Sequence, residues 1–553
     1  MELTANPDWY AVQALPVVGN PSTDDAVAWA TAYYANRLAG VLVEANPAIS
    51  RVFESWKKSG KDQETLMSNL EKNSDLKDLL LTETPWVAEA ADEAEQKRRI
   101  ALLFDLNGMS SRLQQAADKL RTLQLTDGSW SWYKGMKGSR YITTQTVELM
   151  ARLKAMNISL TDGMEAQYGR ALGYLRKEVK KVYEQMRIQE RENNIQVRPD
   201  EQIVKYLYIC ALDETARKQA DKEINTYFLA RLTNCSAECS IYEKSLLAVI
   251  MHAYGQKRQA ELLLQSVKEY MLATPEMGRY FDTSKAGYSW NSYKIPTQVA
   301  AMEAIWRIAP DQHLLGDMKQ WLLKQKQVQV WDTPLATADA VYAFLGMGGN
   351  RLQVSGSLKA RIGLKTLVTP DDALGYVRQT YTGADTEVSR IAVVKSGKGL
   401  SWGAVYAQYL EDMIRVRPFR TNGLGIVREY WLGEEQVSAS TRLKPGDKLT
   451  VRLMVKADRD MDFVQIKDER ASCMEPAVQL SGYHWNGGIG YYQVNKDAST
   501  EFFIDQMRKG TYVLEYTVYL DRPGTYQAGI ATIQSAYAPE FNGHTDGVEL
   551  TIE

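Results

Sequence analysis

Few residues in this chain have the types and spacing that catalysis usually requires. Its 553 residues include four histidines, which are His252, His313, His484 and His544. Because no two of them are close in sequence, zinc catalysis and acid–base chemistry built on several imidazoles are not favoured. The four cysteines are Cys210, Cys235, Cys239 and Cys473. Cys235 and Cys239 could be one helical turn apart, but no second ligand pair accompanies them, so the sequence implies neither a metal site nor a disulfide framework.

Aromatic loops and carboxylates are the remaining candidates for chemistry. The chain has 13 Trp and 31 Tyr against 10 Phe. A loop such as Trp130-Ser-Trp-Tyr133 could stack on a sugar, and a glycoside hydrolase needs two carboxylates across such a groove. No acidic pair is marked out by its setting, since Asp127, Asp282 and Asp332 are as easily turn formers. A hydrolase is therefore kept only as an alternative.

Length and charge exclude several classes of protein. A chain of this length predicts more than one domain. The 66 basic and 68 acidic residues give a net charge of −2, with no basic patch of the kind that a nucleic-acid partner requires. No stretch of eighteen apolar residues is present, so the sequence predicts no membrane insertion.

The spacing of apolar residues changes near residue 350. Before it, apolar residues recur at steps of three and four, as from Leu172 to Met186, which is typical of helices. Helices are expected at 24–43, 61–81, 87–107, 110–124, 142–156, 203–213, 216–231, 241–254, 257–272, 294–308, 312–325 and 335–346. After residue 350 the pattern alternates, as in Leu449, Val451 and Leu453, which predicts antiparallel strands. The chain should therefore be helices first and a β-sandwich afterwards.

The helical part contains a loose repeat. Each copy has a Trp-containing loop followed by a Thr-led helix whose hydroxyl could cap the first turn, and the tryptophans are Trp130, Trp132, Trp290 and Trp331. Repeated helix pairs stack as an open solenoid or as a closed toroid. The string Gln124-Leu-Thr-Asp-Gly-Ser-Trp130 resembles a structural signature of terpenoid cyclase and prenyltransferase α/α toroids. The chemistry of those enzymes is not favoured, because His252 suits an apolar core and Thr23-Asp-Asp-Ala26 suits a helix cap.

Several longer strings resemble the bacterial α2-macroglobulin-like family, in the form common in Bacteroidetes. They include Trp9-Tyr-Ala-Val-Gln-Ala-Leu-Pro16, Leu81-Thr-Glu-Thr-Pro-Trp-Val87, Asp127-Gly-Ser-Trp-Ser-Trp132, Ser401-Trp-Gly-Ala-Val-Tyr406 and Ala536-Tyr-Ala-Pro-Glu540. The resemblance implies a C-terminal fragment of a longer chain. Residues 1–346 would be a thioester-type α/α toroid, residues 347–410 the second half of a CUB-like β-domain, and residues 411–553 a macroglobulin-like β-sandwich. Leu3 and Thr4 would be a remnant of the upstream half of the CUB-like domain.

The reactive centre of that family is a Cys-x-Glu-Gln string, whose thiol and amide form an internal thioester. By resemblance, this string would fall on Asp25, Ala26, Val27 and Ala28. Asp25 has no thiol and Ala28 has no acyl group, so we expect a degenerate thioester position and no covalent trapping.

The resemblance thus implies a non-enzymatic endopeptidase inhibitor that captures proteases non-covalently or sterically, without catalytic residues, metal or cofactor. Its partners would be proteases and the other domains of the full-length chain. Its location would be the periplasm or outer envelope, with lipid anchoring through the missing N-terminal part. Two alternatives stay open: a glycan- or peptide-binding module of the cell envelope that uses Trp130, Trp132, Trp290 and Trp331, and a toroid glycoside hydrolase.

Overall fold

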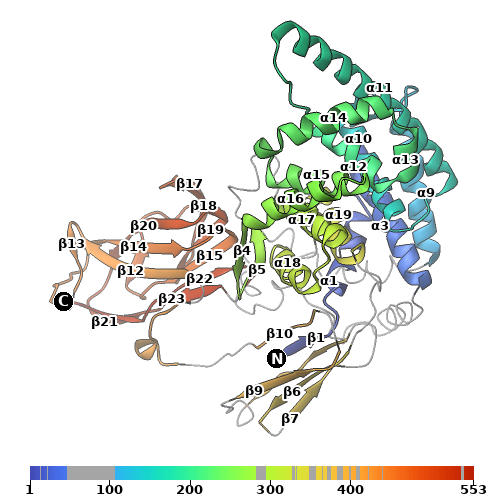
Figure 1. The fold of residues 1–553 in the computed structure, drawn as a ribbon. Coiled ribbons are helices and arrows are strands. Elements are labelled where there is room, and N and C mark those ends of the chain that lie inside the picture. The colour runs from blue at the N-terminus through green and yellow to red at the C-terminus, as the bar shows by residue number, and fades with distance from the viewer. Residues whose placement is uncertain are drawn as a thin grey trace. The chain divides into compact units, whose positions relative to one another are not determined.

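The computed structural model describes two compact units of the chain (Figure 1). The described residues are 1–12, 14–21, 23–45, 106–281, 294–326, 330–331, 333–347, 356–363, 365–369, 375–382, 390–397, 400–405, 411–420, 423–438, 440–536, 538 and 541–553. Those up to Val405 form the N-terminal unit, and those from residue 411 onward form the C-terminal unit.

Helices make up most of the N-terminal unit. They are α1 (Trp9–Val12), α2 (Leu15–Val18), α3 (Ala26–Ala45), α9 (Leu106–Leu123), α10 (Arg140–Ala155), α11 (Asp162–Asn193), α12 (Glu201–Leu212), α13 (Glu214–Gln219), α14 (Lys222–Asn234), η1 (Ser236–Glu238), α15 (Ile241–Ala253), α16 (Lys257–Glu269), α17 (Lys294–Ile308), α18 (Gln312–Lys324) and α19 (Pro334–Leu345). Two short hairpins accompany them, β2 (Trp130–Ser131) with β3 (Gly138–Ser139) and β4 (Met271–Thr274) with β5 (Gly278–Phe281).

An inner ring of helices closes on itself. Helix α3 packs against α10, α10 against α12, α12 against α15, α15 against α17, α17 against α19, and α19 back against α3. A second layer lies outside this ring, where α9 packs on α3, α11 on α10, α16 on α15 and α17, and α18 on α17. The closed ring decides between the two stackings that the sequence allows, and it confirms the α/α toroid.

Burial explains why the two layers differ in sequence. In the inner helix α10 every residue from Ile142 to Leu153 is buried, because one face meets the outer layer and the other meets the centre of the ring. The outer helix α16 buries only the stripe Ala260, Leu263, Leu264 and Val267. The inner helix α10 is therefore buried on all sides, with Glu148 and Arg152 among its buried residues, whereas the outer helix α16 is amphipathic.

The predicted helix 257–272 is too long, because α16 ends at Glu269 and strand β4 begins at Met271. The predicted helix 216–231 is also wrong in its extent. The segment 216–231 is two helices, because the chain breaks between α13 and α14 at Ala220. The Asp221 carboxylate accepts hydrogen bonds from Glu223 N and Ile224 N, so a new helix begins there. The segments 61–81 and 87–105, which are also predicted to be helical, lie outside the described residues.

Two buried tryptophans, Trp130 and Trp331, each join two successive helices of the toroid by hydrogen bonds, and we call these contacts tryptophan ties. Trp130 Nε1 donates to Leu120 O at the end of α9, and Trp130 N donates to the Thr143 hydroxyl in the first turn of α10. Trp331 repeats both contacts, with Leu322 O in α18 and the Thr337 hydroxyl in α19. The sequence repeat thus has a physical basis, because the same three-way tie recurs at both positions.

Two small sheets complete the N-terminal unit. In the first, β1 (Glu2–Thr4) lies between β10 (Trp402–Ala404) and β8 (Tyr376–Arg378). In the second, β6 (Leu358–Ile362) lies between β7 (Lys365–Val368) and β9 (Ile391–Lys395). They share a core whose buried members are Leu3, Ala5, Leu358, Ala360 and Leu367.

The C-terminal unit is an antiparallel β-structure, as the alternating sequence predicts. One sheet has the order β11 (Phe419–Arg420), β23 (Asn542–His544), β22 (Ala531–Ser535), β15 (Met461–Glu469), β19 (Ser499–Met507), β18 (Ile489–Asn495) and β17 (Gly482–Asn486). A second has the order β13 (Glu435–Gln436), β12 (Leu424–Leu432), β14 (Lys448–Ala457), β20 (Gly510–Leu520) and β16 (Met474–Pro476). A two-stranded sheet of β21 (Gly524–Ala528) and β24 (Val548–Ile552) adjoins them.

The core of this unit lies between its sheets. On β14 the inward residues Leu449, Val451, Leu453 and Val455 are fully buried. Arg428 on β12 and Asp468 on β15 form an ion pair of 2.6 Å that joins the two large sheets, and both side chains are 1% exposed. Tyr516 OH also donates to Asp468, at 2.8 Å. A buried charge pair with this additional hydrogen bond fixes how the two sheets face each other.

Candidate functional site

Asp25 caps helix α3. Its Oδ1 accepts hydrogen bonds from Val27 N and Ala28 N, both at 3.0 Å, and its Oδ2 accepts one from the Thr23 hydroxyl at 2.6 Å. The Asp25 side chain is thereby engaged with the backbone at the helix start, and Asp25 is only 8% exposed. Its carboxylate serves the orphan N–H groups that every helix leaves at this end.

The aromatic loop between β2 and β3 lies against this helix start. Ala26 N donates to Trp132 O at 3.0 Å, so the loop and the first residue of α3 share a backbone hydrogen bond. The Trp132 and Tyr133 rings are parallel within 1°, with centroids 6.3 Å apart, and they are 40% and 48% exposed. Next to them, Lys119 Nζ pairs with Asp24 at 3.0 Å. Hydrogen bonds from Lys119 and Trp29 hold the pKa of Asp24 below its ordinary value.

The four tryptophans expected at an aromatic surface do not form one. Trp130 and Trp331 are buried, at 0% and 1% exposed, because they are the ties between helices. Trp290 lies outside the described residues. Of the four, Trp132 is the one that the described part of the chain exposes to solvent. The aromatic surface therefore reduces to Trp132 and its neighbour Tyr133.

Glycine is required in the turn that precedes this loop. Gly128 has φ +94°, and a Cβ at this position would lie 2.4 Å from Arg170 O on α11. Gln124 Nε2 donates to Gly128 O and to Gln167 O, which joins the end of α9 to α11. The string from Gln124 to Trp130 thus has the structural role that its resemblance implied.

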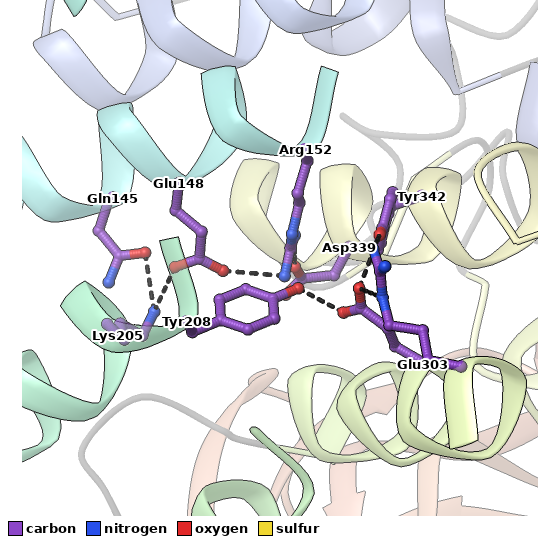
Figure 2. A network of polar contacts seen from close by, with 9 residues as sticks. Gln145, Glu148, Arg152, Lys205, Tyr208, Glu303, Asp339 and Tyr342 are labelled. Carbon is purple, nitrogen blue, oxygen red and sulfur yellow. Dashed lines mark hydrogen bonds and ion pairs between the residues drawn. The ribbon is translucent and has the colours of Figure 1, made fainter. Parts of the chain in front are cut away.

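A network of buried charges occupies the inside of the inner ring (Figure 2). Glu148 on α10 pairs with Arg152 at 2.9 Å and with Lys205 on α12 at 3.1 Å. Arg152 also pairs with Asp339 on α19. Lys205 donates to Gln145 Oε1 at 3.0 Å. Side chains from three inner helices are therefore joined through two cations.

A second centre of this network is Glu303 on α17. Tyr208 on α12 and Tyr342 on α19 donate their hydroxyl groups to Glu303, the latter at 2.8 Å. Arg307 Nε donates to the same carboxylate at 2.7 Å. Counted together, the carboxylates Glu148, Glu303 and Asp339 match the cations Arg152, Lys205 and Arg307. The network is thus neutral in sum, as burial demands.

The electrostatics of the network favour fixed ion pairs. Burial raises the pKa of Glu148, but attraction to Lys205 and Arg152 outweighs it, so that the pKa lies below its ordinary value. Burial and the repulsion from Glu303 hold the pKa of Tyr208 well above its ordinary value. Glu148 is therefore a carboxylate and Tyr208 a hydroxyl donor at neutral pH.

This arrangement does not suit a glycoside hydrolase. Such an enzyme presents an acid and a base to a sugar in an open groove. Burial raises the pKa of Asp339, as a general acid requires, but the Asp339 carboxyl group is already paired with Arg152. Glu148 and Glu303 are 4% and 1% exposed and are bound by cations. These carboxylates serve the closure of the ring.

This network is not predicted by any motif of the sequence. Its signal is a charged residue inside an otherwise apolar inner helix, such as Lys205 between Val204 and Tyr206 or Glu303 between Met302 and Ala304. The partners are far apart in sequence, since Arg152 meets Asp339 only when α19 returns to the ring. The sequence pattern can therefore indicate that these charged residues are buried, but it cannot predict which of them form ion pairs.

The histidines and cysteines do not gather into a metal site in the described residues, where no group of three or more His, Cys, Asp or Glu could hold a metal ion. The four cysteines are free thiols. Among the helices that the structure describes, none is long and apolar enough to cross a membrane.

Comparisons with known proteins find one matching family model and two curated relatives. Residues 423–540 match the family model of the bacterial α2-macroglobulin MG10 domain. The chain is 22% identical over 480 residues to an α2-macroglobulin homolog of Nostoc sp. strain PCC 7120. This match covers 79% of this chain and 23% of that protein. Over 172 residues the chain is 25% identical to circularly permutated Ras protein 2 of Dictyostelium discoideum, which is 30% of this chain and 4% of that protein. The chain thus spans less than a quarter of either curated relative.

Among solved structures, native α2-macroglobulin from Escherichia coli, from domain MG7 to the C-terminus, matches 100% of this chain and 76% of that chain. The sequence identity is 13% and the TM-score is 0.37. Because both values are low, the fold is assigned from the helices and strands of this chain alone. The chain combines a closed α/α toroid with antiparallel β-sheets, which is its fold class. Residues 423–540 match the bacterial α2-macroglobulin MG10 domain, and the chain is similar to bacterial α2-macroglobulins over most of its length.

Proposed function

We propose that this chain is the C-terminal part of a protein that inhibits endopeptidases by non-covalent or steric capture and that has no enzymatic activity of its own. In this proposal, residues 1–346 are the thioester-type toroid, residues 347–410 a CUB-like β-segment and residues 411–553 the macroglobulin sandwich. The partners are proteases and the other domains of the full-length chain. The E. coli protein has been described in forms activated by porcine elastase and by trypsin, which makes these proteases suitable probes.

The observation that carries the non-covalent part is the cap at Asp25. A covalent trap needs an acyl group that is activated by a thiol. In the alignment by resemblance, the thiol position is Asp25, whose carboxylate is bound to Val27 N and Ala28 N, and the acyl position is the methyl group of Ala28. Neither side chain can take part in a thioester, because a carboxyl group supplies no thiol and a methyl group supplies no acyl carbon.

Trypsin capture by the full-length protein tests the proposal. After mixing, residual trypsin activity is measured on a small chromogenic peptide and on casein. Steric capture predicts that cleavage of casein falls at least tenfold while cleavage of the small peptide is retained. Trypsin inactivated at its catalytic serine is the matched control in size-exclusion chromatography, because it cannot cleave the inhibitor and should not co-elute with it.

Two outcomes separate the parts of the proposal. If cleavage of casein is unchanged by the full-length protein, the inhibitor function is wrong. If casein is protected but denaturing electrophoresis and mass spectrometry find trypsin bound covalently to residues 25–28, inhibition stands and the non-covalent mechanism is wrong.

A periplasmic or outer-envelope location with lipid anchoring upstream is part of the same proposal. It follows from the family resemblance, since a trap must meet foreign proteases outside the cytoplasm. Cell fractionation with an antibody to the C-terminal unit tests it. Recovery in the membrane fraction, with release by detergent, is expected, whereas recovery in the cytosol would contradict it.

The exposed pair Trp132 and Tyr133 supports a second candidate, a glycan- or peptide-binding module. Their parallel rings form an aromatic surface of the type that stacks on sugar faces or on proline. A glycan array and a proline-rich peptide library would reveal such binding, and Trp132→Ser should abolish it without loss of folding. Absence of binding at both arrays would exclude this candidate.

A further inference from the structure

Two thiols of the N-terminal unit lie at the two ends of one short turn. Cys235 follows the last residue of α14, and Cys239 follows η1, directly before Ser240, which caps α15. Cys239 Sγ donates to Cys235 O at 3.6 Å. The Cys235 thiol donates to Leu232 O at 3.8 Å. Both thiols therefore lie against backbone carbonyls at the end of α14.

The turn between the two cysteines is short. Four residues rise about 6 Å as an α-helix and about 8 Å as a 3-10 helix, and disulfides join residues whose Cα atoms are about 4.4–6.8 Å apart. The backbone of the turn is not regular α-helix, because Cys235 has φ −101° and ψ 15° and η1 is a 3-10 turn. A disulfide between the two cysteines therefore requires this turn to shorten.

An arginine stands beside the thiols. Arg198 Nη2 lies 3.9 Å from Cys239 Sγ and 2.7 Å from both carboxylate oxygens of Glu243. Burial raises the pKa of Cys239 to about 12, and it raises the pKa of Cys235 above its ordinary value; Arg198 opposes the rise in both. Cys235 is the more exposed thiol, so a reagent from solvent meets it first.

We propose that Cys235 and Cys239 form a reversible dithiol–disulfide site that is oxidised by a low-molecular-weight disulfide. The Cys235 thiolate attacks one sulfur of oxidised glutathione, which forms a mixed disulfide and expels one glutathione thiolate. The Cys239 thiolate then attacks the Cys235 sulfur of this mixed disulfide and expels the second glutathione thiolate. The two protons lost by the cysteines go to the two glutathione thiolates, so the protein loses two hydrogens and the glutathione disulfide is reduced.

The bond would join the end of α14 covalently to the start of α15. The start of α15 is also held by its Ser240–Glu243 capping box and by the ion pair of Glu243 with Arg198, which lies between α11 and α12. Closing a short loop restricts the unfolded chain, so the oxidised protein should be the more stable form. This inference does not depend on the proposed function, since it concerns thiol chemistry of the toroid alone.

Peptide mass spectrometry of the whole chain tests the proposal. Trypsin releases residues 232–244 as one peptide that contains both cysteines and no internal Lys or Arg. The reduced, folded chain is incubated with oxidised glutathione at pH 8, then denatured, alkylated and digested. We expect this peptide to be two hydrogens lighter and unalkylated, to regain two alkyl groups after dithiothreitol, and the Tm of the chain to rise by a few degrees.

Variants make the result specific. Cys210→Ser removes a buried thiol elsewhere and should leave the oxidation unchanged, whereas Cys239→Ser should stop at a mixed disulfide on Cys235. Arg198→Gln should slow the oxidation several-fold, because it removes the cation that favours both thiolates. Full alkylation of the peptide after oxidation, a mixed disulfide that persists in the unmodified chain, or cross-linking to Cys210 or Cys473 would each overturn the proposal.

Discussion

The carboxylate of Asp25 is committed to the helix that begins beside it. Its two contacts with Val27 N and Ala28 N supply acceptors for N–H groups that have no partner within α3. Asp25→Ala should lower the free energy of unfolding by about 1 kcal/mol, the usual cost of losing such a cap. Urea unfolding measures this change. Asp25→Asn keeps the accepting oxygen and should lose much less; equal losses in both variants would show that charge, not the cap, matters.

Arg152 is the residue on which the buried network depends most. It pairs with Glu148 and Asp339, and its side chain is 6% exposed. Arg152→Met should cost about 3–5 kcal/mol in the free energy of unfolding, because two carboxylates stay buried without their cation. Lys119→Met is the matched control, since its ion pair with Asp24 is 40% and 69% exposed and should contribute little to stability. Similar losses in both variants would contradict the role of burial.

At the scale of elements, tryptophan ties hold neighbouring helices together. Trp130→Ala should cost about 3–5 kcal/mol, because it empties a fully buried site between α9 and α10. Trp130→Phe keeps most of the ring but loses the hydrogen bond to Leu120 O, so a smaller loss is expected, of which the bond accounts for about 1 kcal/mol. Thermal unfolding of both variants beside Trp132→Ala, which lies on the surface, measures the difference. A comparable loss in Trp132→Ala would argue against the tie.

An ion pair joins the long helix α11 to α14. Arg231 donates to Glu190 at 2.6 and 2.9 Å, and this hydrogen-bonded pairing lowers the pKa of Glu190 to about 2. Because the folded pKa lies below that of the unfolded chain, near 4.5, the pair stabilises fully above that pH, and the contribution disappears as the pH falls toward 2.

Glu190→Gln should therefore be less stable than the unmodified chain by about 1 kcal/mol at pH 7, and the two should converge between pH 4.5 and 2. Urea unfolding at pH 7, 4 and 3 measures the gap. Glu192→Gln on the same helix is the control, because no ion pair is seen for it among the described residues. A gap that stays constant with pH would contradict the assignment.

Helices and strands could be predicted from the sequence where the spacing of apolar residues follows a single period. The strands β14 and β20 follow from alternation alone, since each buries one side of a sheet. The break between α13 and α14 could not be predicted, because the apolar spacing continues through Ala220 and only the Asp221 cap reveals the new helix start. The Trp loops were predicted as repeats, but whether a Trp is a buried tie or an exposed ring depends on hydrogen bonds that the sequence does not show.

At the scale of the whole molecule, contacts between distant parts of the chain were beyond prediction. The Thr-led helix starts and the repeat indicate a toroid, yet the ring closes only where α19 returns to α3. The charges Glu148, Arg152 and Asp339 meet across that closure, at a separation of 187 residues for the last two. A missing thioester string can be seen in one line of sequence, whereas a network assembled by ring closure needs the structure.

The C-terminal unit should fold when it is separated from the toroid. Its core is built from its own buried strand residues, such as Leu449 and Val451, and contains its own buried ion pair, Arg428 with Asp468. Its length of roughly 140 residues is usual for an independent domain. Residues 411–553 expressed alone should show a β-type circular dichroism spectrum and one cooperative urea transition. Arg428→Met in this fragment should lose about 3–5 kcal/mol, because Asp468 would stay buried without its cation. A non-cooperative transition, or strong binding of a hydrophobic dye by the unmodified fragment, would mean that the sandwich requires the rest of the chain to fold.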